Sequence, residues 1–304
     1  MRNVIGIVGL GIMGGAMADA LLANGYRVVG YDVLPGARRR LGKAGGRPLK
    51  SIAAVTGNAD IVILSLPSST ALRDAVGEIV SAGRRAGKTE RRLVVVETST
   101  LPIADKEEAM RLLKRAGIAL LDCPISGTAV RMKQGAWTIF ASGPESAFRR
   151  ARPILSVFTR NIPYVGNFGN GSRMKFLANH LVAIYNVASA ESITLARKMG
   201  LDPRQVLELF GNSPVVGNGV FRLRGALMAA RRYTPPTMKV EVWQKDMQVI
   251  GDMAKSVDCP TPLFTACVPI YNSAMALHLG QSDTAAVCEV LGTMAGIGRS
   301  RAKH

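Results

Sequence analysis

The sequence has no long hydrophobic run, no paired cysteines and few aromatic side chains. No apolar stretch in the 304 residues reaches the roughly 18 residues that a membrane-spanning helix needs. Glycines interrupt the apolar start "MRNVIGIVGLG", where a signal peptide requires an unbroken segment. The four cysteines form neither a CxxC pair nor a Cys/His pattern. We therefore expect a cytoplasmic protein with no membrane contact, no metal site and buried, inert thiols.

Positive charge exceeds negative charge widely, with a formal net charge of +18. Such an excess is typical of nucleic-acid-binding proteins, but it also attracts small acids and phosphate-bearing cofactors. The basic residues occur in short groups such as Arg38 to Arg40, without aromatic residues between them. Solvated helix faces give the same pattern, so nucleic-acid binding is the weaker alternative.

The hydrophobic pattern divides the chain into two parts. Apolar runs in the first part predict strands, at residues 3–8, 26–32, 59–67, 92–100, 118–124 and 136–143. Their alternation with helical segments predicts an α/β Rossmann fold, a doubly wound parallel sheet covered on both faces. Residues 172–200 then follow helical spacing, and strand patterns cease. We expect a dinucleotide-binding domain over 1–165 and an all-helical substrate and dimerisation domain over 166–304, entered by the long helix.

A glycine motif connects the first predicted strand to the first helix. Gly9, Gly11 and Gly14 form a G-x-G-x-x-G sequence, which is weak evidence alone but specific between a strand and a helix. Gly9 would form the tight turn, Gly11 would admit a pyrophosphate and Gly14 would allow close packing. The phosphates would be held by backbone N–H groups of the motif, which also contains Leu10, Ile12 and Met13. A turn without a ligand is the less specific alternative.

Further cofactor contacts are expected at the ends of later strands. Asp32 ends the second strand, where a carboxylate accepts hydrogen bonds from the adenine-side ribose, so NAD is favoured over NADP. Arg38 to Arg40 leave NADP open, although a solvated helix explains them as well. The remaining candidates lie at the carboxyl edge of the sheet and are Leu66, Pro67, Ser99 and Thr100. Ordinary loop structure explains each of these four equally well.

Two segments contain the side chains that suit acid–base chemistry and carboxylate binding. Lys175 and Asn179 are four residues apart and so share one helix face, after a glycine-rich approach that includes Gly171. A partly desolvated lysine beside a cationic ring would have a lowered pKa, which suits proton transfer near neutral pH. Ser126, Gly127 and Thr128 follow a strand and offer a hydroxyl and backbone N–H groups to a carboxylate. A solvated lysine and a common turn are the alternatives.

Four blocks together resemble the β-hydroxyacid dehydrogenase family. They are "GLGIMGGAMADALLANGYRVVGYD", "DCPISGTAVRMKQGAW", "GNGSRMKFLANH" and "WQKDMQVI". The resemblance covers nearly the whole chain. It implies a Rossmann domain joined by a long helix to an all-helical domain that helps to form a homodimer or homotetramer. It also implies that the enzyme interconverts a small hydroxy acid and its semialdehyde.

The resemblance assigns roles to individual residues. Lys175 matches the catalytic lysine, and Asn179, Ser126 and Gly127 match substrate-binding positions. Lys245 matches a lysine that closes over the cofactor. The chain departs from the pattern in having Thr128 in place of a second glycine.

Several alternatives remain open within and outside the family. The main expectation is an NAD-dependent 3-hydroxyisobutyrate dehydrogenase-like enzyme. An NADPH-dependent glyoxylate or succinic semialdehyde reductase is one alternative. Arg131 and Lys133 could read a second polar group on a longer acid, as an L-threonate dehydrogenase would need, or simply be exposed. A non-catalytic nucleotide- or nucleic-acid-binding protein on the same scaffold is the alternative of a different class.

Overall fold

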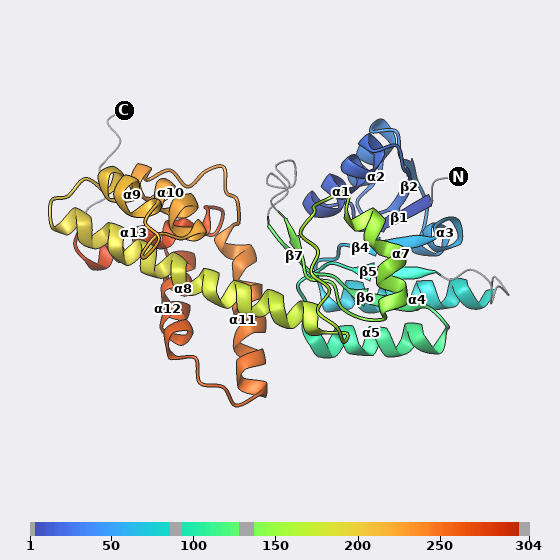
Figure 1. The fold of residues 1–304 in the computed structure, drawn as a ribbon. Coiled ribbons are helices and arrows are strands. Elements are labelled where there is room, and N and C mark those ends of the chain that lie inside the picture. The colour runs from blue at the N-terminus through green and yellow to red at the C-terminus, as the bar shows by residue number, and fades with distance from the viewer. Residues whose placement is uncertain (1–3, 86–92, 128–136, 298–304) are drawn as a thin grey trace. The chain divides into compact units, whose positions relative to one another are not determined.

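Alternation of strands and helices in the first half of the chain produces a parallel sheet. The computed structural model describes residues 4–85, 93–127 and 137–297. Two compact units are present, Met1–Lys175 and Phe176–His304, and the boundary between them falls inside one long helix (Figure 1). The predicted fold class, a Rossmann-type sheet followed by an all-helical region, is confirmed.

The main sheet of the first unit has six strands in the order β3-β2-β1-β4-β5-β6, with every neighbouring pair parallel. This is the strand order of dinucleotide-binding folds, in which ligands bind at the carboxyl ends of the strands. The strands are β1 (Val4–Val8), β2 (Arg27–Tyr31), β3 (Arg47–Pro48), β4 (Ile61–Leu64), β5 (Val94–Glu97) and β6 (Ala119–Asp122). The short β3 was not predicted.

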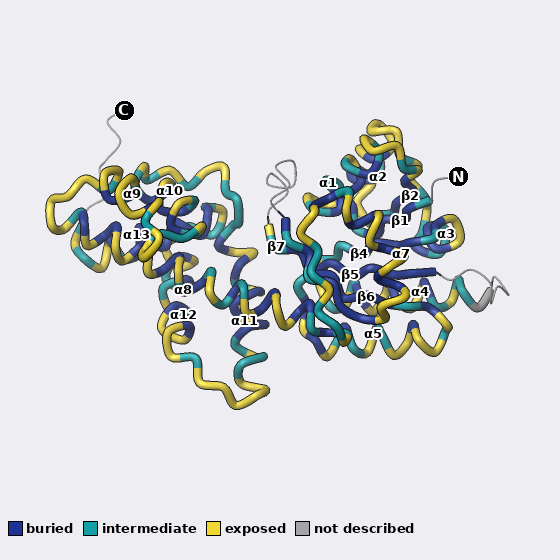
Figure 2. Tube along the Cα trace, viewed as in Figure 1, coloured by how far each residue is buried: buried dark blue, intermediate teal, exposed yellow. Residues whose placement is uncertain are grey.

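Both faces of this sheet are covered, so successive strand residues enter different cores. Ile61 and Ile63 belong to one apolar cluster, whereas Val62 and Leu64 belong to the other. Figure 2 shows the strands as buried and the outer helices as partly exposed. The helices are α1 (Ile12–Ala23), α2 (Pro35–Lys43), α3 (Ile52–Asn58), α4 (Ser69–Arg85), α5 (Ile103–Arg115) and α7 (Glu145–Leu155). Burial on two faces explains why the strands read as unbroken apolar runs.

One predicted strand folds differently from the others. Within the described residues 137–143, the strand is β8 (Thr138–Ile139), and it pairs antiparallel with β7 (Ile125–Ser126) instead of joining the main sheet. The chain folds back at this point, because Asp122 at the end of β6 exchanges backbone hydrogen bonds with Ser142. An apolar run alone does not distinguish these two pairings.

The regular elements described in the second unit are all helices, and one isolated bridge joins Lys239 to Asp283. The long helix α8 (Asn170–Lys198) begins in the first unit and continues into the second. The other helices are α9 (Pro203–Gly211), η1 (Phe221–Gly225), α10 (Ala226–Ala230), α11 (Val240–Ser256), α12 (Pro262–Ala276), η2 (Thr284–Ala286) and α13 (Val287–Met294). Across the described ranges, none of the helices combines the length and apolarity needed to cross a bilayer.

Candidate functional site

The three glycines of the first loop have different structural requirements. A Cβ on Gly9, whose φ is +88°, would lie 2.1 Å from the carbonyl oxygen of Ser65. A Cβ on Gly14 would lie 1.8 Å from the carbonyl oxygen of Gly9. A Cβ on Gly11 would meet no atom within 4 Å. The fold itself thus requires Gly9 and Gly14, whereas Gly11 borders open space.

The open side of this loop has the features of an anion site. Gly11 is the N-cap of α1 and provides no capping side chain. Ile12, the next residue, is 82% exposed, while Leu10 is buried. The N-terminus of a helix attracts negative charge through its N–H groups and dipole. These residues fit the pyrophosphate of a dinucleotide, and Met13 lies on the same first turn of α1.

Asp32 connects the glycine loop to the following turn. One carboxylate oxygen accepts a hydrogen bond from the Leu10 N–H at 2.7 Å, and the other accepts one from the Leu34 N–H at 2.8 Å. Arg38 does not extend into solvent as a helix-face residue would. Its Nη1 donates to the Asp32 carbonyl oxygen at 2.5 Å, and its guanidinium lies 5.7 Å from the Tyr31 ring centroid. The Arg38 guanidinium is therefore bonded to the backbone of Asp32, the predicted ribose-binding residue.

The ends of β4 and β5 are joined through a side chain. The Leu66 N–H donates to the Ser99 hydroxyl oxygen at 2.8 Å. Ser99 is buried, while Thr100 is half-buried and Pro67 is exposed. Ser99 thus has a structural role at this edge, and Leu66, Pro67 and Thr100 border the same edge.

Two buried carboxylates lie side by side at the carboxyl edge of the sheet. Glu97 ends β5 and Asp122 ends β6, and the two residues are direct partners in the parallel pairing. Both are fully buried. Like charges at neighbouring strand ends repel each other, so a cation is required between them.

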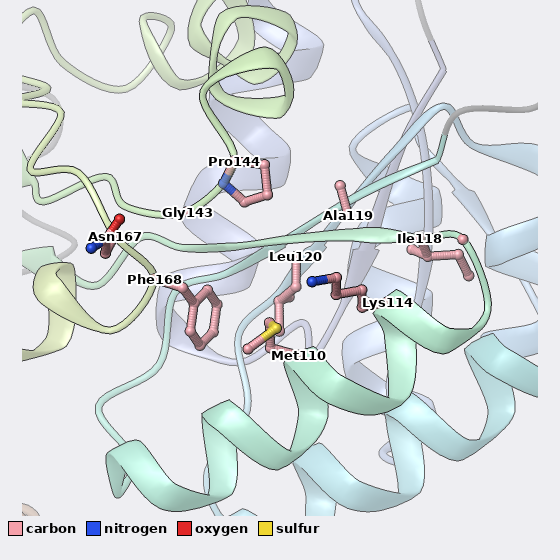
Figure 3. Close-up of a pocket in the computed structure, with 10 residues that line it drawn as sticks. Met110, Lys114, Ile118, Ala119, Leu120, Gly143, Pro144, Asn167 and Phe168 are labelled. Atoms are coloured by element: carbon pink, nitrogen blue, oxygen red, sulfur yellow. The ribbon is translucent and has the colours of Figure 1, made fainter.

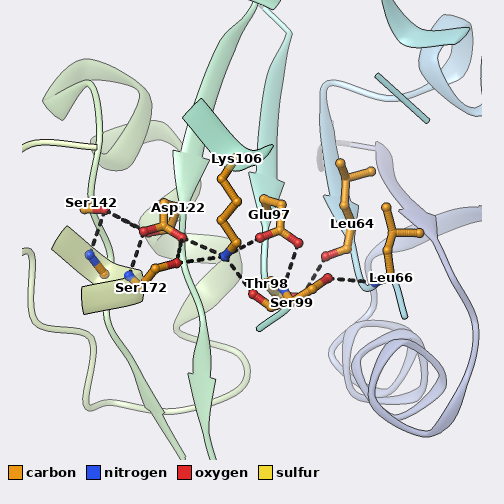
Figure 4. A network of polar contacts seen from close by, with 10 residues as sticks. Leu64, Leu66, Glu97, Thr98, Ser99, Lys106, Asp122, Ser142 and Ser172 are labelled. Carbon is orange, nitrogen blue, oxygen red and sulfur yellow. Dashed lines mark hydrogen bonds and ion pairs between the residues drawn. The ribbon is translucent and has the colours of Figure 1, made fainter. Parts of the chain in front are cut away.

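Lys106 supplies that cation from the first turn of α5 (Figure 4). Its Nζ lies 2.5 Å from Glu97 Oε2 and 2.9 Å from Asp122 Oδ1. It also contacts the Ser99 carbonyl oxygen at 2.6 Å and the Ser172 hydroxyl oxygen at 2.9 Å. Burial alone would lower the pKa of Lys106, but Asp122 and Glu97 outweigh burial and raise that pKa well above its ordinary value. Lys106 is therefore charged throughout the neutral range.

The network extends to the beginning of α8. The Ser172 hydroxyl donates to Asp122 Oδ1 at 2.8 Å, and the Ser172 N–H donates to Asp122 Oδ2 at 2.7 Å. The Gly171 N–H donates to the Ser142 hydroxyl oxygen at 3.0 Å. Asp122 thus accepts from the first turn of α8, where a carboxylate is stabilised by the helix dipole.

Gly171 explains part of the glycine-rich approach to α8. A Cβ at this position would lie 2.3 Å from the Phe140 carbonyl oxygen and 2.7 Å from the Asp122 carbonyl oxygen. The absent side chain lets the first turn of α8 pack directly against the ends of two extended segments. The close packing gives a structural reason for the glycine at position 171.

Lys175 and Asn179 follow on α8, and both are buried. Lys175 lies one turn after Ser172. Asn179 belongs to the second unit, where its Nδ2 donates to Asp246 Oδ2 at 2.9 Å. Lys245 Nζ lies 3.7 Å from Asp246 Oδ1, and its side chain is 41% exposed. Asp246 on α11 therefore holds the amide of Asn179 and contacts Lys245.

The predicted carboxylate seat is described in part. Ser126 is half-buried and pairs with Thr138 in the small sheet. Gly127 has a φ of +137°, a conformation that side-chain-bearing residues rarely adopt. Thr128, like Arg131 and Lys133, lies outside the described residues.

Sequence reasoning missed Glu97, Lys106 and Asp122, although the sequence contains a signal for them. Lys106 follows Ile103 by three residues and precedes Ala109 by three, so it falls on the buried face of α5. A lysine on an apolar helix face requires a buried anion. Glu97 and Asp122 each end an apolar strand and are the nearest candidates.

The described part of the chain can be compared with the requirements of a metal site and of buried thiols. Over the described ranges, no cluster of three or more His, Cys, Asp or Glu side chains is arranged to hold a metal ion. Burial raises the pKa of the Cys123 thiol. The expectation of four buried thiols is wrong for Cys259, which is exposed because it lies in the turn between α11 and α12.

A cavity of about 510 Å³ opens beside β6 and α5 (Figure 3). Its lining is mainly apolar, with Lys114 as the cationic residue: Met110, Lys114, Gly117, Ile118, Ala119, Leu120, Gly143, Pro144, Asn167 and Phe168. None of the predicted site residues is among them. The lining given above also contains no residue of the glycine loop and none of the Lys106 network.

Two family models cover the chain. The NAD binding domain of 6-phosphogluconate dehydrogenase matches residues 4–166. The NAD-binding domain of NADP-dependent 3-hydroxyisobutyrate dehydrogenase matches residues 169–291. The two matches together reach from the first strand to the last helix.

Individual proteins are similar over nearly their whole length. L-threonate dehydrogenase of Cupriavidus necator is 30% identical over 292 residues, which are 95% of this chain and 96% of that protein. Human mitochondrial 3-hydroxyisobutyrate dehydrogenase is 28% identical over 95% of this chain and 87% of its own. The solved structure of Mycobacterium tuberculosis 3-hydroxyisobutyrate dehydrogenase with L-serine has a TM-score of 0.85 at 25% identity, covering 96% of this chain and 99% of that one.

The strand order, the glycine loop and these matches agree with one another. NAD is supported as the class of cofactor. The chain belongs to the β-hydroxyacid dehydrogenase family and is an NAD(P)-dependent hydroxyacid dehydrogenase.

Proposed function

We propose that the protein is an NAD-dependent, 3-hydroxyisobutyrate dehydrogenase-like enzyme that interconverts a small β-hydroxy acid and its semialdehyde. The observation that carries this proposal is the pair of buried groups on α8, Lys175 and Asn179, four residues apart. Lysine is rarely buried in proteins, because removing its charge from water costs free energy, so its burial here indicates a specific role. The L-serine in the Mycobacterium tuberculosis structure is itself a β-hydroxy acid.

In the proposed mechanism, Lys175 moves the proton. When bound, NAD supplies the hydride acceptor. The Lys175 amine takes the proton from the substrate hydroxyl during oxidation, and the ammonium returns a proton to the aldehyde oxygen during reduction. Asp246 holds one N–H of Asn179, so the amide keeps a fixed orientation toward the reacting hydroxyl. Such orientation raises the rate by limiting the substrate to reactive arrangements.

The substrate carboxylate would bind at Ser126, Gly127 and Thr128. Ser126 contributes a hydroxyl donor, and the positive φ of Gly127 turns the backbone in a way that suits N–H groups facing an anion. The reacting carbon and the carboxylate are then held by different segments of the chain.

The cofactor would bind at the carboxyl edge of the main sheet, beginning at the glycine loop. The pyrophosphate contacts would come from the N–H groups of Gly9, Leu10, Gly11, Ile12, Met13 and Gly14. Asp32 would accept from the ribose hydroxyls, which favours NAD over NADP. Leu66, Pro67, Ser99 and Thr100 would flank the nucleoside groups. Lys245 is a further candidate contact, because it matches a cofactor-binding lysine of the family.

A longer hydroxy acid such as L-threonate is the second candidate, because the Cupriavidus necator relative bears the name L-threonate dehydrogenase. NADP is the second candidate for the cofactor, because Arg38 lies beside Asp32. A 2′-phosphate would need that guanidinium to turn outward. Steady-state rates with both cofactors decide this point, since NAD specificity requires a higher kcat/KM with NAD.

A homo-oligomer is the proposed assembly. Leu177, Leu181 and Tyr185 follow one another at intervals of four along α8 and are 62%, 46% and 39% exposed. An exposed apolar stripe of this kind suits a second copy of the chain. Leu181→Glu should shift the mass measured by light scattering to that of a monomer. A cytoplasmic location also remains a prediction.

The proposed chemistry is tested by measuring reduced cofactor with 3-hydroxyisobutyrate, glycerate, 4-hydroxybutyrate and threonate. Lys175→Ala should lower kcat by about 10²- to 10⁴-fold, because it removes the proton-transfer group. Lys198→Ala, at the far end of α8, is the matched control and should keep the wild-type rate. Equal rates in wild type and Lys175→Ala on an accepted acid would refute the role of Lys175.

A further inference from the structure

We propose that Lys106 is a positioning residue for catalysis: its bonds to Asp122 and Ser172 hold the first turn of α8 in place and so set the position of Lys175. The proposal rests on the proposed function of Lys175. Lys106 itself is fully buried and reaches its partners from α5. It therefore acts through other residues and does not contact the reacting atoms.

Glu97 and Asp122 use their carboxylate oxygens in the same way: one oxygen binds Lys106, and the other accepts from a backbone N–H. Glu97 directs Oε2 to Lys106 and accepts the Ser99 N–H on Oε1 at 2.8 Å. Asp122 directs Oδ1 to Lys106 and accepts the Ser172 N–H on Oδ2. Each carboxylate thus joins the ammonium on one side to backbone on the other. One cation orders the loop after β5 and the beginning of α8 together.

Ser172 is the connection that leads toward Lys175. Its hydroxyl oxygen accepts from Lys106 and its hydroxyl hydrogen goes to Asp122, so both bonding directions are fixed. Lys175 lies three residues later, on the neighbouring part of the same helix face. A rotation of the first turn would carry the Lys175 ammonium with it.

The same ammonium also reaches segments that would contact substrate and cofactor. The Ser99 carbonyl oxygen accepts from Lys106, and the Ser99 hydroxyl holds the Leu66 N–H. Asp122 is followed, four residues later, by Ser126 of the proposed carboxylate seat. Lys106 is therefore bonded directly to the loop after β5, to the end of β6 and to the first turn of α8.

The test compares Ser172→Ala with Thr56→Val. Ser172→Ala removes the hydroxyl between Lys106 and Asp122 but keeps the Ser172 backbone bond and all three charges. Thr56→Val removes another buried hydroxyl of the same unit, which donates only to the Ile52 carbonyl oxygen of its own helix. Both variants are assayed as the full chain, well below their melting temperatures, beside wild type and Lys175→Ala.

We expect Ser172→Ala to lower kcat by roughly 10- to 100-fold, because small misplacements of a catalytic group have effects of this size. The KM for NAD should stay within about twofold, because the glycine loop is untouched. Hydrogen exchange followed by mass spectrometry should show amides of residues 172–176 exchanging roughly tenfold faster. Thr56→Val should keep the wild-type kcat and the wild-type exchange in this segment.

Two results would overturn the positioning role. One is a Ser172→Ala enzyme with wild-type kcat, and the other is an equal loss of kcat in Thr56→Val. The proposed function fails separately, through an active Lys175→Ala enzyme. In that case hydrogen exchange still decides whether the network fastens α8, because unchanged exchange in Ser172→Ala refutes the proposal without any assay of turnover.

Discussion

At the scale of single residues, the glycine loop separates the requirements of the fold from those of the ligand. Gly14→Ala would bring a methyl group within 1.8 Å of the Gly9 carbonyl oxygen, so backbone must move. Gly11→Ala would place its methyl group in open space. The two substitutions add the same atom three residues apart. Gly14→Ala should therefore lower stability, whereas Gly11→Ala should weaken cofactor binding.

We predict that Gly11→Ala melts like the wild type but binds NAD at least about tenfold more weakly, because its methyl group enters the path of the pyrophosphate. Gly14→Ala should lose about 1–3 kcal/mol or more of stability, as overpacked sites do. Calorimetric unfolding and titration with NAD measure the two effects. Wild-type affinity in a folded Gly11→Ala protein would show that the cofactor lies elsewhere.

At the scale of secondary-structure elements, Lys106 holds β5, β6 and α8 together. Lys106→Met should destabilise the protein by about 3–5 kcal/mol, because it leaves Glu97 and Asp122 buried without their cation. Urea unfolding of wild type and variant at pH 7 measures the difference in the free energy of unfolding. A loss below about 1 kcal/mol would contradict the need for a cation between the two carboxylates.

Glu97→Gln combined with Lys106→Met is the control for that prediction. The double variant removes one carboxylate together with the cation and leaves a single buried charge. It should be more stable than Lys106→Met alone, because the repulsion between neighbouring strand ends is gone.

A second ion pair connects α10 to α13 in the helical unit. Arg231 Nη2 lies 2.5 Å from Glu289 Oε2, and the Tyr233 hydroxyl donates to Glu289 Oε1 at 2.8 Å. Burial alone would raise the pKa of Glu289, but the hydrogen bonds from Arg231 and Tyr233 lower it. A lowered folded-state pKa gives stability that is present above the unfolded pKa, near 4.5, and is lost as the pH falls through the folded value.

We predict that Glu289→Gln costs about 1–3 kcal/mol at pH 7, because Arg231 loses its charged partner. The variant should also lose less stability than the wild type between pH 5 and pH 3. Denaturant unfolding across that range provides the measurement. Parallel stability curves for the two proteins would contradict the lowered pKa of Glu289.

The elements differ in how much of them the sequence predicts. Strands such as β1 and β4 are predictable because both of their faces are buried, which leaves an unbroken apolar run. Asp32 and the glycine loop are predictable because their spacing follows from the geometry of a strand, turn and helix. The strand β8 is not predictable in this way, since its pairing with β7 depends on where the chain folds back. Lys106 resembles any charged helix residue until its spacing from Ile103 and Ala109 shows that it lies on the apolar face of α5.

At the scale of the whole molecule, the main electrostatic feature is the formal net charge of +18. Both the proposed substrate and NAD are anions, so this charge should increase their rate of encounter. We predict that kcat/KM falls by roughly 3- to 10-fold between about 0.01 M and 0.5 M salt, while kcat changes little. Salt-dependent retention on DNA without turnover of any acid would instead favour the nucleic-acid-binding alternative.

The continuity of α8 has an evolutionary consequence. Lys175 and Asn179 are separated by four residues of one helix, a rise of about 6 Å. Inserting or deleting one residue between them would rotate one relative to the other by about 100°. The two side chains share one face of the helix only while this interval is kept. Descendants of this protein that keep the same chemistry should therefore inherit the four-residue interval in α8 unchanged.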